Sequence, residues 1–142
     1  MKLLLPTDGS PASLQAIRFL LANRRWFQEP LEFHLLNIQQ PVRGDVGRFV
    51  GKDQLRSFHH DEGMKALTPG RAILDEAGAP CSVHLGVGDE AGALIARFAH
   101  DQGMDLIVMG KKGQSAIASV LIGSVASSVT RVATIPVMLV GE

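Results

Sequence analysis

The sequence predicts an α/β domain built on one doubly wound sheet of five parallel strands. Five short apolar runs are spread along the chain, and several are apolar at consecutive positions, which is typical of strands buried on both faces. The stretches between these runs show helical periodicity, and such alternation predicts a parallel sheet covered by helices. The runs expected to form strands are residues 3–5, 31–38, 82–85, 106–109 and 137–140.

The expected strand order is the flavodoxin-like order 3-2-1-4-5. In sheets of this kind, ligands bind outside the carboxyl ends of the strands, at the point where the strand order reverses. That point lies between the first and the fourth strand. The loops that follow residues 5 and 109 are therefore expected to form one pocket.

The first helix is expected to begin directly after Ser10. Serine is a favoured N-cap residue, and proline, here Pro11, is favoured at the first helical position. Leu14, Ile17 and Leu21 then fall on one face at i, i+3 and i+7, which predicts the face that packs on the sheet.

Two more helices are expected, one before the fourth strand and one before the fifth. Gly103 is a typical C-terminal residue for the former, and Pro136 follows the latter and opens the last strand. The apolar stripes that predict them are Ala91, Leu94, Ile95, Phe98 and Ala99 in the former and Val125, Ser128, Val129 and Val132 in the latter.

The segment between the second and third strands is the least regular. Residues 39–51 contain Pro41 and several glycines and are expected to form a long loop. Residues 53–78 have helical character. Thr68 and Pro69 are expected to break or restart that helix, because proline removes a helical hydrogen bond and clashes with the preceding turn.

Composition and charge narrow the classes of protein to consider. The 142 residues fit a single domain, residues 1–142, and the 14 basic residues balance the 14 acidic ones. This neutrality gives no support for a nucleic-acid partner or an anionic membrane surface. The single cysteine, Cys81, excludes a disulfide within the chain, favours the cytoplasm, and fits a small core residue better than a nucleophile. The apolar run ahead of Pro6 is too short for a signal peptide or a membrane span.

The most informative motif is a glycine-rich stretch that follows the fourth apolar run. Gly110, Gly113, Gly123 and Ser124 give the spacing G-x2-G-x9-G-S. Glycines here let the backbone approach a ligand closely and adopt positive φ, and the helix expected after Gly123 directs unpaired amides at the loop. The pattern predicts a phosphate site, although its spacing matches neither the Walker motif nor the dinucleotide fingerprint. A glycine-rich connection without a ligand is the alternative.

Asp8 follows the first strand, where the topology brings it to the same pocket. Its carboxylate can accept a hydrogen bond from a ribose hydroxyl or hold Mg²⁺ beside phosphates. An Asp-Gly pair is also ordinary turn chemistry. The glycine loop expected beside Asp8 favours the binding role.

Several segments besides the glycine loop carry a family resemblance. They are Pro6-Thr7-Asp8-Gly9-Ser10, residues 105–110, residues 122–126 and residues 135–140, with a looser match at Gly86 and Gly88. Together they resemble the universal stress protein family, in the subgroup that binds ATP. The resemblance covers essentially the whole chain and is weakest over residues 39–79. Asp89 stands where a proline is common, which puts the shape of the outer pocket rim in doubt.

The resemblance implies a site for ATP with Asp8 near the ribose, and Mg²⁺ bound with ATP is an additional possibility at Asp8. Residues implied on the adenosine side are Pro6, Thr7 and Asp8, with Asn37 and Ile38 bordering the adenine and Met109 against the base or sugar. Residues implied around the phosphates are Gly110, Gly113, Gly123, Ser124 and Val125. Taken by themselves, Asn37, Ile38 and Met109 fit equally well as core residues at strand ends.

Other polar residues carry weaker signals. Lys111 and Lys112 lie within the glycine loop and suit a polyphosphate, although loop lysines are usually solvated. Residues 59–62 (His-His-Asp-Glu) include metal-capable side chains, but neighbouring positions diverge and no second cluster has ligand spacing. A solvated segment is the favoured interpretation. No histidine base is evident in the sequence near any of five serines, so nucleophilic catalysis is unsupported rather than excluded. These serines are Ser10, Ser115, Ser119, Ser127 and Ser128.

These observations predict an ATP-binding stress-response or regulatory protein with slow or no hydrolysis. A fast ATPase needs a positioned water, a general base and a charge clamp, and no such set is evident. The alternatives are a hydrolase or transferase that uses ATP and an interaction module without nucleotide. The uncharged last strand, residues 137–140, is expected at a sheet edge, and both this bare edge and the family resemblance predict a homodimer paired through it.

Overall fold

The structure, a computed structural model, describes residues 1–43, 50–113, 119 and 121–141. All neighbouring strands of its five-stranded sheet are parallel, in the order β3-β2-β1-β4-β5. The strands are β1 (Lys2–Pro6), β2 (Glu32–Gln39), β3 (Cys81–Val87), β4 (Leu106–Gly110) and β5 (Val137–Val140). The predicted fold class and strand order are therefore confirmed.

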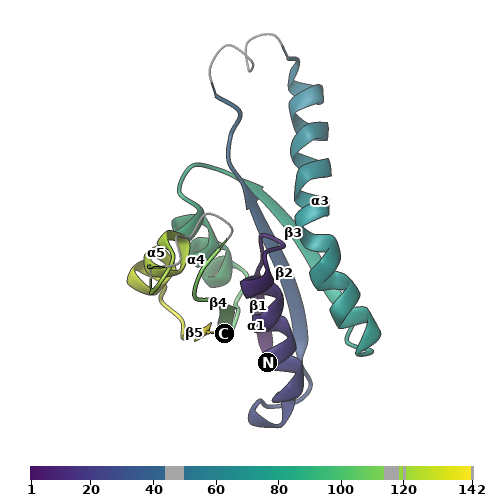
Figure 1. Ribbon diagram of the computed structural model, residues 1–142, viewed down its shortest axis with the longest axis vertical. Helices are drawn as coiled ribbons and strands as arrows, with labels where there is room; N and C mark the ends of the chain where they lie inside the picture. Colours follow the sequence, from purple (N-terminus) through teal and green to yellow (C-terminus); the bar gives the residue numbers. More distant parts are fainter. Residues whose placement is uncertain (44–49, 114–118, 120, 142) are drawn as a thin grey trace.

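Helices cover both faces of this sheet (Figure 1). On one face lie α1 (Pro11–Ala22) and α3 (Lys52–Glu76), and on the other lie α4 (Ala91–Asp101) and α5 (Ser124–Val132). A short 3-10 helix, η1 (Arg24–Trp26), follows α1 and was not expected from the sequence.

The central strands are apolar at consecutive positions because both of their faces are covered. Leu3 and Leu5 belong to the core cluster under α1 and α3, whereas Leu4 belongs to the cluster under α4 and α5. Successive side chains of a strand point to opposite faces, so an uninterrupted apolar run is what a doubly covered strand requires.

The ends of the helices agree with their predicted positions better than the buried faces do. Ser10 caps α1 through its side chain, as predicted, and Gly103 has a φ of 64° after α4. In α1, however, the buried residues are Ser13, Ala16, Ile17 and Leu20, so the buried face is rotated from the predicted stripe. In α5, Val125 and Val132 are 39% and 43% exposed, and the core contacts come from Ala126 and Val129.

The expected break at Thr68 and Pro69 is wrong, because α3 runs through both residues without interruption. Proline leaves the carbonyl of residue i−4 without its helical donor, and that residue, Lys65, is exposed, so water can take the donor's place. The Thr68 hydroxyl donates to the Met64 carbonyl at 2.6 Å, which satisfies a further carbonyl of the same turn. The resulting long helix rises past the carboxyl ends of the strands (Figure 1). No helix in the described ranges is long and apolar enough to span a membrane.

Candidate functional site

A cavity of about 320 Å³ lies at the carboxyl ends of β1, β2 and β4, where the strand order reverses. The loops after β1 and β4 both line it, as the topology predicted. All eleven residues singled out from the sequence line this cavity: Pro6, Thr7, Asp8, Asn37, Ile38, Met109, Gly110, Gly113, Gly123, Ser124 and Val125. Their role in binding stays a prediction.

Part of the cavity wall is formed by residues that were not predicted from the sequence. Ala91 and Ile95 of α4 line it beside Leu36 of β2, together with Ser13 and Ala126. The sequence signal for Ala91 and Ile95 was present as an apolar stripe, but the periodicity could not separate residues facing the core from residues facing the pocket. The result is an apolar slot between the end of β2 and the start of α4.

The opposite side of the cavity is formed by the N-terminus of α5. Gly123 is the N-cap, and the first hydrogen bond within the helix runs from the Ser127 amide to the Gly123 carbonyl at 2.9 Å. The amides of Ser124, Val125 and Ala126 precede that bond and have no acceptor within the helix. Because these three residues line the cavity, the positive end of the helix dipole lies at its edge, where an anion is stabilised.

The loop glycines are required by close packing. A β-carbon on Gly113 would lie 2.7 Å from Asp8 Oδ2, and one on Gly123 would lie 3.2 Å from the Lys112 α-carbon. The expectation of positive φ at these glycines is wrong, since the described glycines with positive φ are Gly9, Gly78 and Gly103. The middle of the loop, residues 114–118 and 120, lies outside the described residues and includes Ser115.

Asp8 forms the turn that the sequence left open and also lines the cavity, and its binding role stays a prediction. Its Oδ1 accepts a hydrogen bond from the Ser10 amide at 2.9 Å, which is turn chemistry. Its Oδ2 lies close to Gly113, and both residues line the cavity. The turn therefore fixes the carboxylate beside the glycine loop.

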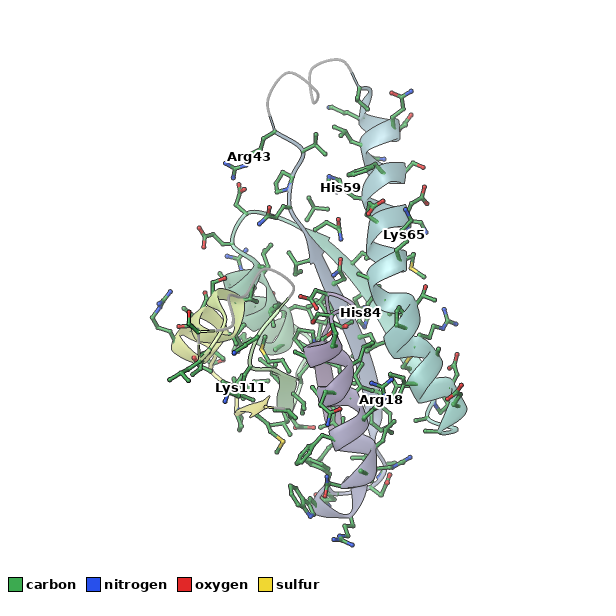
Figure 2. The ribbon with its side chains drawn as sticks, in the orientation of Figure 1. Arg18, Arg43, His59, Lys65, His84 and Lys111 are labelled. Carbon is green, nitrogen blue, oxygen red and sulfur yellow. The ribbon has the colours of Figure 1, made fainter. Side chains whose placement is uncertain are left out.

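The two loop lysines separate in space. Lys112 lines the main cavity. The Lys111 side chain lies against Gly141 and lines a smaller recess of about 210 Å³, which Lys112, Ala12 and Gln15 also line. Figure 2 places Lys111 on the β5 side of the molecule, away from α3. Only Lys112 is thus positioned at the main cavity.

A buried chain of hydrogen bonds supports the end of β2. Asn37 is 4% exposed, and its Nδ2 donates to the Thr7 carbonyl at 2.8 Å. Gln39 Nε2 donates in turn to Asn37 Oδ1 at 2.7 Å. The Thr7 hydroxyl lies 2.9 Å from the Ser13 hydroxyl, which ties the same turn to α1.

Asp89 and the metal-capable residues 59–62 are not among the residues that line the cavity. Asp89, the departure from the family pattern, pairs with Arg43 beyond the end of β2 and so joins two loops near the start of α4. Among the described residues, no group of three or more His, Cys, Asp or Glu side chains is arranged to hold a metal ion. Residues 59–62 lie on the N-terminal half of α3, where His60 is exposed.

A histidine pair lies on the α4 face of the sheet, next to the cavity wall. His34 Nδ1 and His84 Nε2 are 3.0 Å apart, with the two rings inclined by only 17°. Glu32 lies 3.3 Å from His34 Nε2, which favours a proton on that nitrogen and makes His34 Nδ1 the acceptor for His84. His84 also contacts the Phe98 ring of α4, at 4.8 Å between centroids. Burial lowers the pKa of His84 below its ordinary value, and the charge on His34 lowers it further.

This histidine pair predicts that the fold loses stability in acid. In the unfolded chain His84 regains its ordinary pKa of about 6.5, so below that pH the unfolded chain binds more protons than the folded one. The free energy of unfolding should therefore fall as the pH falls through that value, and partial exposure of the ring keeps the effect small. Urea unfolding at about pH 7.5 and 5.5 measures this, and His84→Gln should reduce the difference. His60→Gln, at an exposed position, should not. An equal pH effect in all three proteins would contradict the assignment.

Comparison with known proteins identifies relatives along the whole chain. The model of the universal stress protein family matches residues 1–141. Universal stress protein MJ0531 of Methanocaldococcus jannaschii is 30% identical over 145 residues, which cover 98% of this chain and 81% of that protein.

Solved structures show the same fold. Protein MJ0577 superposes with a TM-score of 0.80 at 24% identity, over 99% of this chain and 95% of that one. A universal stress protein in complex with cAMP gives a TM-score of 0.66 at 26% identity, over 99% and 96% of the two chains. The Archaeoglobus fulgidus universal stress protein in complex with dAMP gives 0.70 at 23% identity, over 98% and 96%.

Proposed function

The chain belongs to the universal stress protein family, and we propose that it is a regulatory member that binds adenine nucleotides, ATP among them. The observation that carries the proposal is the cavity itself, which joins an apolar slot to a glycine loop and a helix N-terminus. An adenine ring fits the first and a phosphate chain fits the second. Structural neighbours bound to cAMP and dAMP support the same class of ligand.

The end of β2 is suited to an adenine base. The ladder between β1 and β2 ends at Pro6 and Leu36, with the Thr7 amide donating to the Leu36 carbonyl at 2.9 Å. By strand alternation, Ile38 is the next residue whose amide and carbonyl face that side, beyond the end of β1. One donor beside one acceptor matches the amino group and ring nitrogen of adenine, whereas guanine presents a carbonyl in place of the amino group.

The phosphates then extend toward α5. The Ser124 hydroxyl, the first amides of α5 and the Lys112 side chain all line that end of the cavity. Asp8 could hold a Mg²⁺ ion that accompanies the nucleotide, because carboxylate and phosphate oxygens are the ligands Mg²⁺ prefers. The ion would neutralise the repulsion between Asp8 and a polyphosphate.

Hydrolysis of bound ATP is expected to be slow. Among the described lining residues Asp8 is the single carboxylate, and the Ser10 amide already engages its Oδ1. We expect turnover below about 1 per second, the lower end of the kinase range. Phosphate release from Mg-ATP measures it. Turnover at tens per second that disappears in Asp8→Ala would place the protein among ATP-using enzymes.

Measuring ATP affinity beside turnover separates the candidate functions. Binding with negligible turnover supports a regulatory nucleotide-binding protein, and binding with rapid turnover supports a hydrolase or transferase. No binding of ATP or AMP at millimolar concentration would support an interaction module and overturn the proposal.

We also propose a cytoplasmic homodimer. The single cysteine suits a reducing compartment, and β5 lies at one edge of the sheet. Val137, Met138 and Leu139 are only partly buried. An uncharged, partly exposed edge strand invites pairing with a second copy about a two-fold axis.

A further inference from the structure

The polarity of the hydrogen-bond chain behind the base end of the cavity is fixed at one end by the backbone. The Thr7 carbonyl can only accept, so the atom of Asn37 that faces it at 2.8 Å must be the nitrogen. The Asn37 oxygen therefore faces Gln39, and the Gln39 atom 2.7 Å away must be a donor. The orientations of both carboxamides follow from chemistry without ambiguity.

The same hydrogen bonds determine which group donates to the Thr7 carbonyl. If the β1–β2 ladder continued, the Thr7 carbonyl would accept from the Ile38 amide, as the register of Pro6 with Leu36 shows. Instead, the Asn37 side chain donates to it. The Ile38 amide is thereby left facing the cavity that Ile38 lines.

We propose that Gln39 is a positioning residue for the base end of the cavity. It holds the Asn37 carboxamide in the one orientation in which Asn37 engages the Thr7 carbonyl and leaves the Ile38 amide for the ligand. Gln39 itself does not line the cavity, and its backbone carbonyl is tied to the Gly88 amide at 2.9 Å, so it acts through Asn37. The inference rests on the proposed function in taking an adenine nucleotide as the ligand.

Gln39→Glu tests this with almost no change of shape. At high pH the carboxylate of the variant would face Asn37 Oδ1, so two acceptors would meet where a hydrogen bond stood. At lower pH the protonated carboxyl group can donate, and the original polarity returns. A purely structural role for Gln39 would not be restored by acid.

The expected result is a pH-dependent loss of ATP affinity. At about pH 8 we expect Gln39→Glu to bind about tenfold more weakly than wild type, the effect of one lost hydrogen bond. At about pH 5 the ratio should return toward one. Calorimetry measures the ATP affinity at each pH. Each affinity is expressed relative to wild type, so the effect of ATP ionisation on binding cancels. Gln40→Glu is the matched control. Gln40 is exposed, and this substitution introduces the same charge at the next position in the sequence.

Other titrating groups are shared by all these proteins and cancel in the ratio. Those on the elements around the end of β2 are Asp8 after β1, Asp89 after β3, Arg43 after β2, and His59 and Glu62 on α3. A ratio near one at pH 8, or a tenfold loss that persists at pH 5, would overturn the proposal.

A second measurement separates this inference from the proposed function. In the ligand-free Gln39→Glu variant, carbon NMR should show the introduced carboxyl group titrating well above the ordinary glutamate value of about 4.3, because its charged form faces an acceptor. An ordinary pKa for that group would overturn the positioning role whether or not ATP binds. If wild type binds no nucleotide while the pKa of the introduced carboxyl group is raised, the positioning of Asn37 stands and the proposed ligand is wrong.

Discussion

Replacing Gly113 with valine is expected to weaken ATP binding by about 100-fold, or about 2.7 kcal/mol. A β-carbon at this position would lie 2.7 Å from Asp8 Oδ2, and the Ser10 amide restrains the same carboxylate through its other oxygen. The carboxylate would have to move, and the valine methyl groups would occupy space next to the phosphates. Calorimetry with Mg-ATP measures the loss.

Gly51→Val is the matched control for this change. Gly51 has an ordinary negative φ, and a β-carbon added to it would have no atom within 4 Å, so the same substitution meets open space. This variant should bind ATP as wild type does. Thermal unfolding of both variants checks that the fold survives. Equal affinity of Gly113→Val and wild type would remove the glycine loop from the binding site.

The protein is expected to be a dimer in solution, with twice the 15.2 kDa mass of the chain. Pairing through β5 would extend two five-stranded sheets into one continuous sheet and cover the partly exposed Val137 and Leu139. Val137→Lys places a charge on this edge, and like charges brought together across a two-fold axis are destabilising. Light scattering at micromolar concentration should show the dimer for wild type and a monomer for Val137→Lys.

The opposite edge of the sheet supplies the control. Val87 of β3 is 48% exposed, so Val87→Lys adds the same charge to an edge that the proposal leaves unpaired. That variant should remain a dimer. A wild-type mass near 15.2 kDa, or dissociation by Val87→Lys alone, would show that β5 is not the interface.

The sequence was most informative where one physical signal dominated. Consecutive apolar residues located the central strands β1 and β4, because both faces of these strands are covered. Ser10 and Gly103 marked helix ends, because capping depends on local chemistry. The alternation of elements then placed Asp8 and the glycine loop at one cavity.

The missed features depend on the tertiary structure. Pro69 is accommodated because Lys65 is exposed and the Thr68 hydroxyl donates a hydrogen bond to the Met64 carbonyl. Neither fact can be predicted from the general effect of proline on helices. Ile95 and Ala99 belong to one stripe and to one core cluster, but Ile95 also lines the cavity and Ala99 does not. The role inferred for Gln39 required the distances of two hydrogen bonds.

The central claim is that an adenine nucleotide lies between the end of β2 and the N-terminus of α5. Titration of the 15N-labelled protein with ATP, followed by amide NMR, tests it most directly. The amides of Ile38 at the base end and Ser124 at the phosphate end should shift together and give one dissociation constant. AMP should shift Ile38 as ATP does and Ser124 less. The account would be contradicted if millimolar ATP left both amides unmoved, or if saturating shifts appeared only at residues outside this cavity.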